Sequence, residues 1–150
     1  RGYMVSSEVF GIPVKTDPRE TDGKPGLLKA FQDATAVVDS SGLCVFTTFA
    51  WTMNDIQPQI QAACPGDWSL ESLLAMGERI WNLERDFNLA AGLSGKDDTL
   101  PPRLLTEPCK TGASQGMVAE IGKMLPEYYS LRGWTADGVP TAATRARLGL

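Results

Sequence analysis

The strongest constraint on the fold is a long helical pattern in DWSLESLLAMGERIWNLERDFNLAAGL, residues 67–93. Its apolar residues form one stripe at helical spacing, widened by three more: Leu70, Leu73, Leu74, Ile80, Trp81 and Phe87, with Met76, Leu83 and Ala90. Ser69 stands before the stripe and is a suitable N-cap. A helix that is apolar on two sides packs inside a bundle, so the segment predicts a helical fold.

The charged residues of this segment gather in one region: Glu78, Arg79, Glu84, Arg85 and Asp86. Such a cluster can be a functional surface or a solvated and partly paired helix face. Because exposed pairs of this kind are common and weak, we favour the second interpretation.

A second helix is predicted from Lys24 onward. Its apolar face is again at helical spacing: Leu27, Leu28, Phe31, Ala34, Thr35 and Val38. Asp22 is a candidate cap, and Pro25 suits the first turn. The pattern ends into the sequence Asp39-Ser40-Ser41-Gly42.

Shorter helices are predicted elsewhere. Residues 43–53 are apolar nearly all round, so we expect a buried helix there, although periodicity alone leaves the type ambiguous. Residues 54–63 predict a short helix that stops at Cys64-Pro65-Gly66. Helical spacing resumes at Met117, with Pro126 expected to separate two abutting helices. The tail predicts a last helix with Pro140 in its first turn.

The remaining segments are irregular. Residues 1–22 form a predicted N-terminal arm broken by proline and glycine, and residues 92–114 are loop-like with three prolines. In that loop, the adjacent carboxylates of Asp97 and Asp98 point in different directions, so a loop cap is favoured over a metal or acid–base pair. The prediction is one all-α domain over residues 1–150 with long proline-rich connections. Such long loops are usually functional or packed against something else.

Composition excludes several classes of function. The sequence contains no histidine, the commonest general base, so self-contained Ser/His or Cys/His catalysis is excluded. Its three cysteines include no C-x-x-C pair and cannot complete a zinc or iron–sulfur site, which needs about four ligands. The net charge of -4, without long runs of either sign, argues against nucleic-acid and membrane partners.

No apolar run approaches the roughly 20 residues of a membrane span, and no signal-peptide pattern occurs at the N-terminus. We therefore expect a soluble, cytoplasmic protein. Because the sequence starts at Arg1 without a methionine, we also expect it to be a piece of something longer.

The stretch from Asp39 to Cys44 combines an acid, a glycine and a thiol. Gly42 permits a positive φ, and a helix that opens behind it would favour the thiolate of Cys44. Asp39 lies at the negative end of the preceding helix and needs a donor from outside, such as the N–H of a ligand ring. Taken alone, this weak pattern favours a mere turn that contains a buried cysteine.

Four blocks in order resemble the C-terminal part of the tungsten-containing aldehyde:ferredoxin oxidoreductases. The first is LKAFQDATAVVDSSGLCVFTTFA, residues 28–50, in which the family motif D-x-x-G-L-C matches residues 39–44 at every fixed position. The others are ERIWNLERDFN at residues 78–88, DDTLPPRL at 97–104 and YYSLRGWTADGVPT at 128–141. The resemblance covers essentially the whole chain.

The resemblance implies roles for five residues. The motif cysteine of the family is the fourth thiolate of a [4Fe–4S] cluster, which makes Cys44 the expected metal ligand. The motif aspartate hydrogen-bonds a pterin, which points to Asp39, and the backbone of Leu43 and Val45 is expected against the same pterin. Arg1 stands near a basic residue that contacts the cofactor. Cys64 and Cys109 receive no ligand role and are expected to be small buried hydrophobes.

The implied enzyme oxidises a small aldehyde to a carboxylic acid at a tungsten (or molybdenum) bis-pterin and passes electrons through the cluster to ferredoxin. This chain would be its C-terminal domain, inactive without the N-terminal domains, in a possible homodimer. One alternative is a related reductase of aromatic acyl thioesters. Another is a non-catalytic helical scaffold domain in which Cys44 is a plain thiol.

Overall fold

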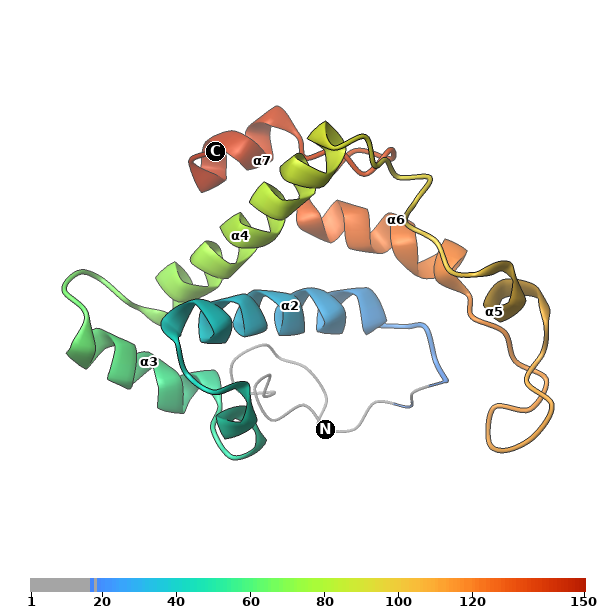
Figure 1. Ribbon diagram of the computed structural model, residues 1–150, viewed down its shortest axis with the longest axis horizontal. Helices are drawn as coiled ribbons and strands as arrows, with labels where there is room; N and C mark the ends of the chain where they lie inside the picture. The colour runs from blue at the N-terminus through green and yellow to red at the C-terminus, as the bar shows by residue number, and fades with distance from the viewer. Residues whose placement is uncertain (1–16, 18) are drawn as a thin grey trace.

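The computed structural model describes residue 17 and residues 19–150, whose regular secondary structure is almost entirely helical, with long loops between the helices (Figure 1). The elements are α2 (Lys24–Ser41), η1 (Val45–Phe49), α3 (Met53–Ala63), α4 (Leu70–Ala90), α5 (Pro102–Thr106), α6 (Ile121–Arg132) and α7 (Ala142–Leu148). Within these residues the β structure is one isolated bridge, between Trp134 and Pro140. The prediction of an all-α fold is confirmed. No helix in the described part of the chain is both long and apolar enough to cross a membrane.

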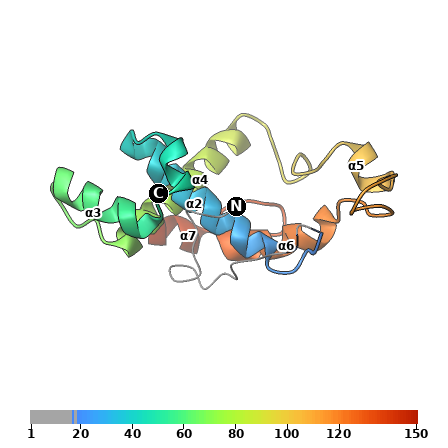
Figure 2. The same ribbon diagram turned by 90° about the horizontal axis from the view of Figure 1, so that it is seen from below.

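The core lies where α2 packs against α4 and α3 (Figures 1 and 2). Its fully buried side chains come from these three helices: Ala34, Val37, Val38, Met53, Ile56 and Leu73. The close approach of α2 and α4 depends on Gly77, since a Cβ at that position would lie 2.8 Å from the carbonyl carbon of Asp33. Part of the two predicted apolar stripes meets here, with Ala34, Val38 and Leu73 buried. The prediction that the α4 stripe is packed along its length is wrong for Leu83 and Phe87, which are 53% and 73% exposed.

A buried polar network fastens α6 to α2. The guanidinium of Arg132, with 0% of its surface exposed, donates to Asp33 at 2.5 Å and to Gln32 at 2.7 Å. The hydroxyl of Tyr128 donates to the same Gln32 oxygen at 2.6 Å. Because a buried charge is tolerated only when it is paired and hydrogen-bonded, this network fixes how α6 sits on α2.

The ends of the long helices follow local rules. Ser69 caps α4 as predicted, accepting a hydrogen bond from the amide of Ser72 at 3.2 Å. Helix α2 begins differently: Gly23 occupies the cap position with φ 70°, and the predicted cap at Asp22 is wrong. The helix ends at Gly42, whose φ of 76° is the left-handed conformation that glycine adopts without strain.

The segment after Gly42 differs from its prediction. Instead of a buried helix over residues 43–53, it forms the five-residue 3-10 helix η1, in which Phe46 is 71% exposed and Phe49 is 63% exposed. Its threonines bond locally, since the hydroxyl of Thr47 donates to Cys44 and that of Thr48 to Val45. Thr52 then caps the start of α3 through a capping box with Asp55. The apolar segment therefore does not continue into α3 as one helix.

The two C-terminal prolines also differ from expectation. Pro126 lies inside a continuous α6 and does not separate two helices. A proline removes one helical hydrogen bond, but the residues beyond it are held by the polar contacts to α2. Pro140 precedes α7 and is not in its first turn, because the N-cap is Thr141, whose hydroxyl accepts from the amide of Thr144.

Candidate functional site

Residues 39–45 form one exposed edge at the C-terminal end of α2. Asp39 is exposed in the last turn of the helix, and Cys44 is exposed at the cap of η1. Val45 is also exposed, whereas Leu43 packs against the core. The structure thus brings four of the five predicted site residues to one edge. Arg1 lies outside the described residues.

The backbone on both sides of Cys44 is held by hydrogen bonds. The Ser41 hydroxyl donates to the carbonyl of Val38 at 2.7 Å and accepts from the amide of Leu43 at 3.3 Å. Thr47 donates twice to the carbonyl of Cys44, from its amide at 2.9 Å and from its hydroxyl at 2.8 Å. The thiol is therefore presented to the outside from a fixed backbone, and the interpretation of a turn with a buried cysteine is wrong.

The donor set of this edge is one thiol and one carboxylate. No group of three or more His, Cys, Asp or Glu side chains that could hold a metal ion occurs among the residues that the structure describes. An exposed thiol fits one position of a four-ligand iron–sulfur cluster, provided that the other ligands come from elsewhere. Cys64 and Cys109 are exposed too, so the expectation that they are buried hydrophobes is wrong.

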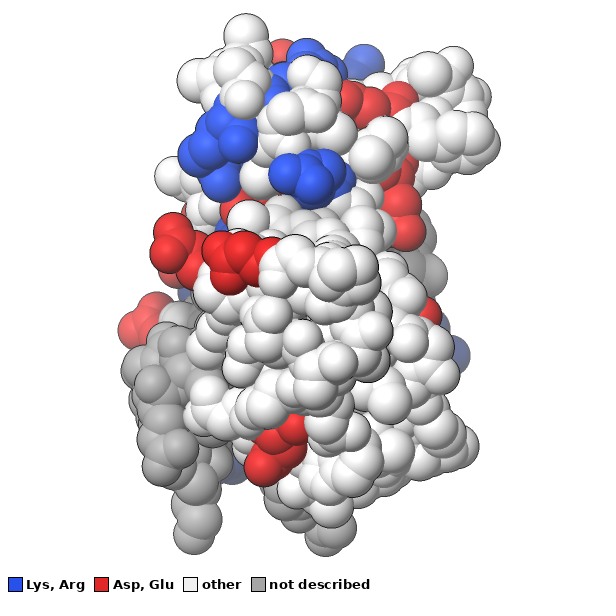
Figure 3. Space-filling view, turned by 90° about the vertical axis from the view of Figure 1, so that its left-hand side faces the viewer, with Lys and Arg blue, Asp and Glu red and all other residues white. Residues whose placement is uncertain are grey.

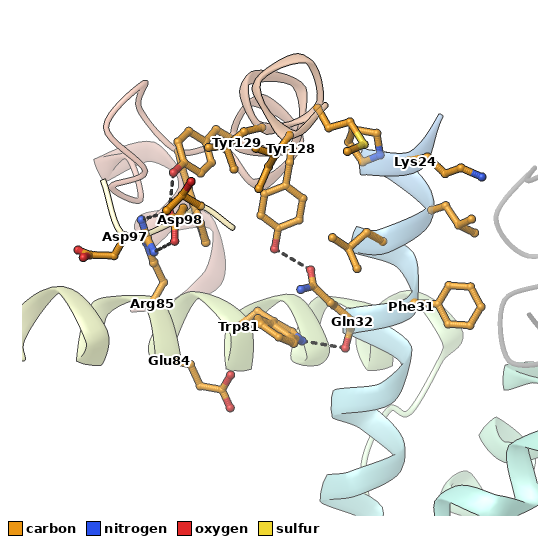
Figure 4. A pocket seen from close by; sticks show the side chains of 18 of the residues that line it. Lys24, Phe31, Gln32, Trp81, Glu84, Arg85, Asp97, Asp98, Tyr128 and Tyr129 are labelled. Carbon is orange, nitrogen blue, oxygen red and sulfur yellow. Dashed lines mark hydrogen bonds and ion pairs between the residues drawn. The ribbon is translucent and has the colours of Figure 1, made fainter. Parts of the chain in front are cut away.

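A cavity of about 810 Å³ lies between α2, α4, α6 and the loop at residues 97–99. Its apolar walls come from α2 and α6: Leu27, Leu28, Ile121, Met124 and Leu125. Figure 4 shows the other side, where Arg85 and Tyr129 converge on Asp98 and Tyr128 points toward Gln32. One side of the cavity is therefore apolar, and the other side is polar and aromatic.

Three polar side chains of the cavity, those of Arg85, Asp98 and Tyr129, satisfy one another. Arg85 holds both oxygens of Asp98, at 2.9 and 2.6 Å, and Tyr129 donates to the same carboxylate at 2.5 Å. Burial and the hydrogen bond to Asp98 raise the pKa of Tyr129 to about 12, so its phenol is a neutral donor at pH 7. No buried side-chain polar atom in the described residues lacks a partner. The cavity thus offers apolar and aromatic surface, and its lining also includes the charged side chains of Lys24 and Glu84.

All four sequence blocks meet in this cavity, the first through Leu28, Phe31 and Gln32. Trp81 and Arg85 come from residues 78–88, Asp98 from residues 97–104, and Tyr129 and Trp134 from residues 128–141. The resemblance of these blocks to a known family was the only sequence signal that pointed to their residues. Nothing in the sequence indicated that the blocks line one cavity.

The charged residues of these blocks bear out part of the prediction. Asp97 caps its loop as predicted, accepting from the amide of Ser94 at 2.7 Å. The charges on α4 are partly paired, as expected, through Asp86 with Arg145 and Glu78 with Arg147. Glu78 and Arg85 are nevertheless buried, so the predicted solvated face is wrong for these two residues.

Comparison with known proteins gives one consistent result. The family model described as aldehyde ferredoxin oxidoreductase, domains 2 and 3, matches residues 1–150. A tungsten-containing aldehyde ferredoxin oxidoreductase of Pyrococcus abyssi is 49% identical over 150 residues, which are 99% of this chain and 25% of the relative. The protein of the same name from Thermococcus kodakarensis is 49% identical over 140 residues, 92% of this chain and 23% of the relative. The chain thus spans about a quarter of the length of these relatives.

Proposed function

The chain belongs to the aldehyde ferredoxin oxidoreductase family, and on that premise we propose that it is the C-terminal helical domain of a tungsten-containing enzyme. The proposed reaction is the oxidation of a small aldehyde to a carboxylic acid, with the electrons passed to ferredoxin. Because this chain covers only about a quarter of its relatives, the remaining domains would carry most of the active site.

The observation that carries this proposal is the exposed thiol of Cys44. In the complete enzyme its thiolate would be one of about four ligands of a [4Fe–4S] cluster, and the remaining domains would supply the others. When bound, the cluster and a tungsten bis-pterin supply the electron transfer and the oxidation chemistry. The contribution of this chain is to hold the Cys44 backbone still through Ser41 and Thr47.

Asp39 is proposed to accept a hydrogen bond from a ring N–H of the pterin. An exposed carboxylate suits this role because the nearby C-terminal end of α2 offers no helix donors of its own. The backbone of Leu43 and Val45 would lie along the same group, with Arg1 contributing a positive charge. The names of the relatives favour tungsten over molybdenum.

The further partners of the proposed enzyme are ferredoxin and a second copy of the polypeptide, in the cytoplasm. A reductase of aromatic acyl thioesters is a weaker alternative, because the relatives compared above are named as aldehyde oxidoreductases. A scaffold domain would hold no cluster, so a measurement of iron content distinguishes it from the aldehyde oxidoreductase and from the thioester reductase.

The test uses a chimaera in which this chain replaces the matching residues of the Pyrococcus abyssi relative. Cys44→Ser should remove most of the iron and the visible absorbance of the cluster, because serine replaces one thiolate ligand. Cys109→Ser, at another exposed cysteine, is the matched control and should keep both. Unchanged iron in Cys44→Ser would refute the ligand role.

A further inference from the structure

The segment between Asp39 and Asp67 is nearly free of charge. Its only ionisable acid or base other than cysteine is Asp55, in a chain of which 21% of the residues are charged. That one carboxylate is engaged locally, since it accepts from the amide of Thr52 at 2.8 Å and from its hydroxyl at 2.9 Å. The surface on the α3 side of the molecule correspondingly shows few charged atoms in the lower half of Figure 3.

The same segment exposes large apolar side chains. Val45, Phe46, Phe49 and Trp51 are all exposed, and the rings of Phe46 and Phe49 stack with their centroids 5.8 Å apart. We call these four residues the η1 surface. Exposed aromatic residues combined with an absence of charge are the composition of the centre of a protein interface. Isolated exposed hydrophobic residues occur on every protein, but here two exposed aromatic rings stack on each other within one short segment.

The η1 surface starts at the residue that follows Cys44. An occupant of this surface would therefore also border the thiol, which is exposed in the described chain. The relatives contain about three times as much polypeptide outside the matched region as inside it, since the match covers 25% of their length. In the relatives, the rest of the polypeptide is thus a large, covalently linked partner of this domain. It must contact some part of the surface of this domain.

We propose that the remaining domains of the same polypeptide pack on the η1 surface. Phe46 and Phe49 would be the main apolar contacts that become buried there. The inference rests on the proposed function only in placing this chain within a longer enzyme. Packing there would exclude water from the side of Cys44 that faces η1. It would also shield the hydrogen bonds of the short 3-10 helix from water.

Hydrogen exchange in the chimaera described above tests the proposal. The informative amides are those of Ala50 and Trp51, which both bond the carbonyl of Thr47. They should exchange at least about tenfold more slowly in the chimaera than in the chain alone, and Phe46→Asp should abolish that difference, as expected for a buried aromatic anchor. Phe87→Asp is the matched control, because Phe87 is 73% exposed on α4, and it should leave the protection unchanged.

Each other outcome overturns the proposal. Equal exchange in the chimaera and the chain alone means that nothing covers the surface. Slow exchange already in the chain alone assigns the surface to residues 1–16 if it is independent of concentration, or to a second copy if it appears with a dimer. If Phe87→Asp loses as much amide protection as Phe46→Asp, the loss is a general effect of the added charge. Cys44→Ser should keep the protection while losing iron, so the failure of one proposal is distinguishable from that of the other.

Discussion

Replacement of Gly77 by alanine tests the central helix crossing directly. Gly77 lies inside α4, where a Cβ would come within 2.8 Å of the Asp33 carbonyl carbon and closer still to its oxygen. An ordinary carbon contact is about 3.5 Å, so α2 and α4 would have to separate by about 1 Å. A backbone carbonyl cannot rotate away as a flexible side chain can.

The expected cost follows from two opposing effects. Alanine in a helix interior gains about 1 kcal/mol over glycine. Overpacking costs about 1–3 kcal/mol, and a gap of about 1 Å between the helices forfeits up to half of the dispersion energy of the contacts it opens. We expect these losses to exceed the gain, with a net fall of about 2 kcal/mol in the free energy of unfolding. That is a large share of the stability of a small domain.

Urea unfolding of the chain, followed by far-UV circular dichroism, measures this free energy. The matched control is Gly122→Ala in α6, where a Cβ would meet no atom within 4 Å. This control should be neutral or stabilising by up to about 1 kcal/mol. If Gly77→Ala is as stable as Gly122→Ala, the two helices do not cross at this glycine and the packing argument fails.

Two further predictions concern the polar networks. Because burial and the bond to Asp98 raise the pKa of Tyr129 to about 12, the neutral phenol is favoured in the folded protein, and its contribution to stability is complete below about pH 10 and lost as the pH rises through 12. Absorbance at alkaline pH should therefore show a late tyrosine step that disappears in Tyr129→Phe; an unchanged titration would contradict the buried bond. Arg132→Met should lower the free energy of unfolding by up to about 3 kcal/mol at pH 7, because it removes one of the two cations that pair with the buried carboxylate of Asp33 and leaves only Lys29. The double variant with Asp33→Asn should recover part of that loss, and equal stabilities of the single and double variants would contradict the pairing.

The helices that were predicted well are those in which the sequence pattern and the packing coincide. The stripes of α2 and α4 are helical in period and meet at the core around Ala34, Val38 and Leu73, so local periodicity was sufficient to predict both helices. It did not predict that Leu83 and Phe87 of the same α4 stripe are exposed. The error at residues 43–53 has a different cause. An apolar segment without charge has the same composition whether it fills a core or covers an interface, and Phe46 and Phe49 are exposed in this chain.

The candidate site was predictable where it is local in sequence. Asp39 and Cys44 reach the same edge because a few residues separate them around one glycine turn. The cavity was not predictable, because the pairing of Arg85 with Asp98 depends on how the loop after α4 folds back. Likewise Pro126 favoured a helix break, but the contacts of Arg132 with α2 override that local preference.

The position of the exposed edge is set by the buried network. Gln32 and Asp33 lie seven and six residues before Asp39 on the same helix, about 10 Å along its axis. Both are held by α6 through Arg132 and Tyr128, and the carbonyl of Gln32 also accepts from the indole of Trp81 on α4 at 2.8 Å. A rigid helix transmits a rotation or shift at these residues to its end. The buried contacts of α2 therefore determine where Asp39 and Cys44 are presented, although neither residue touches them.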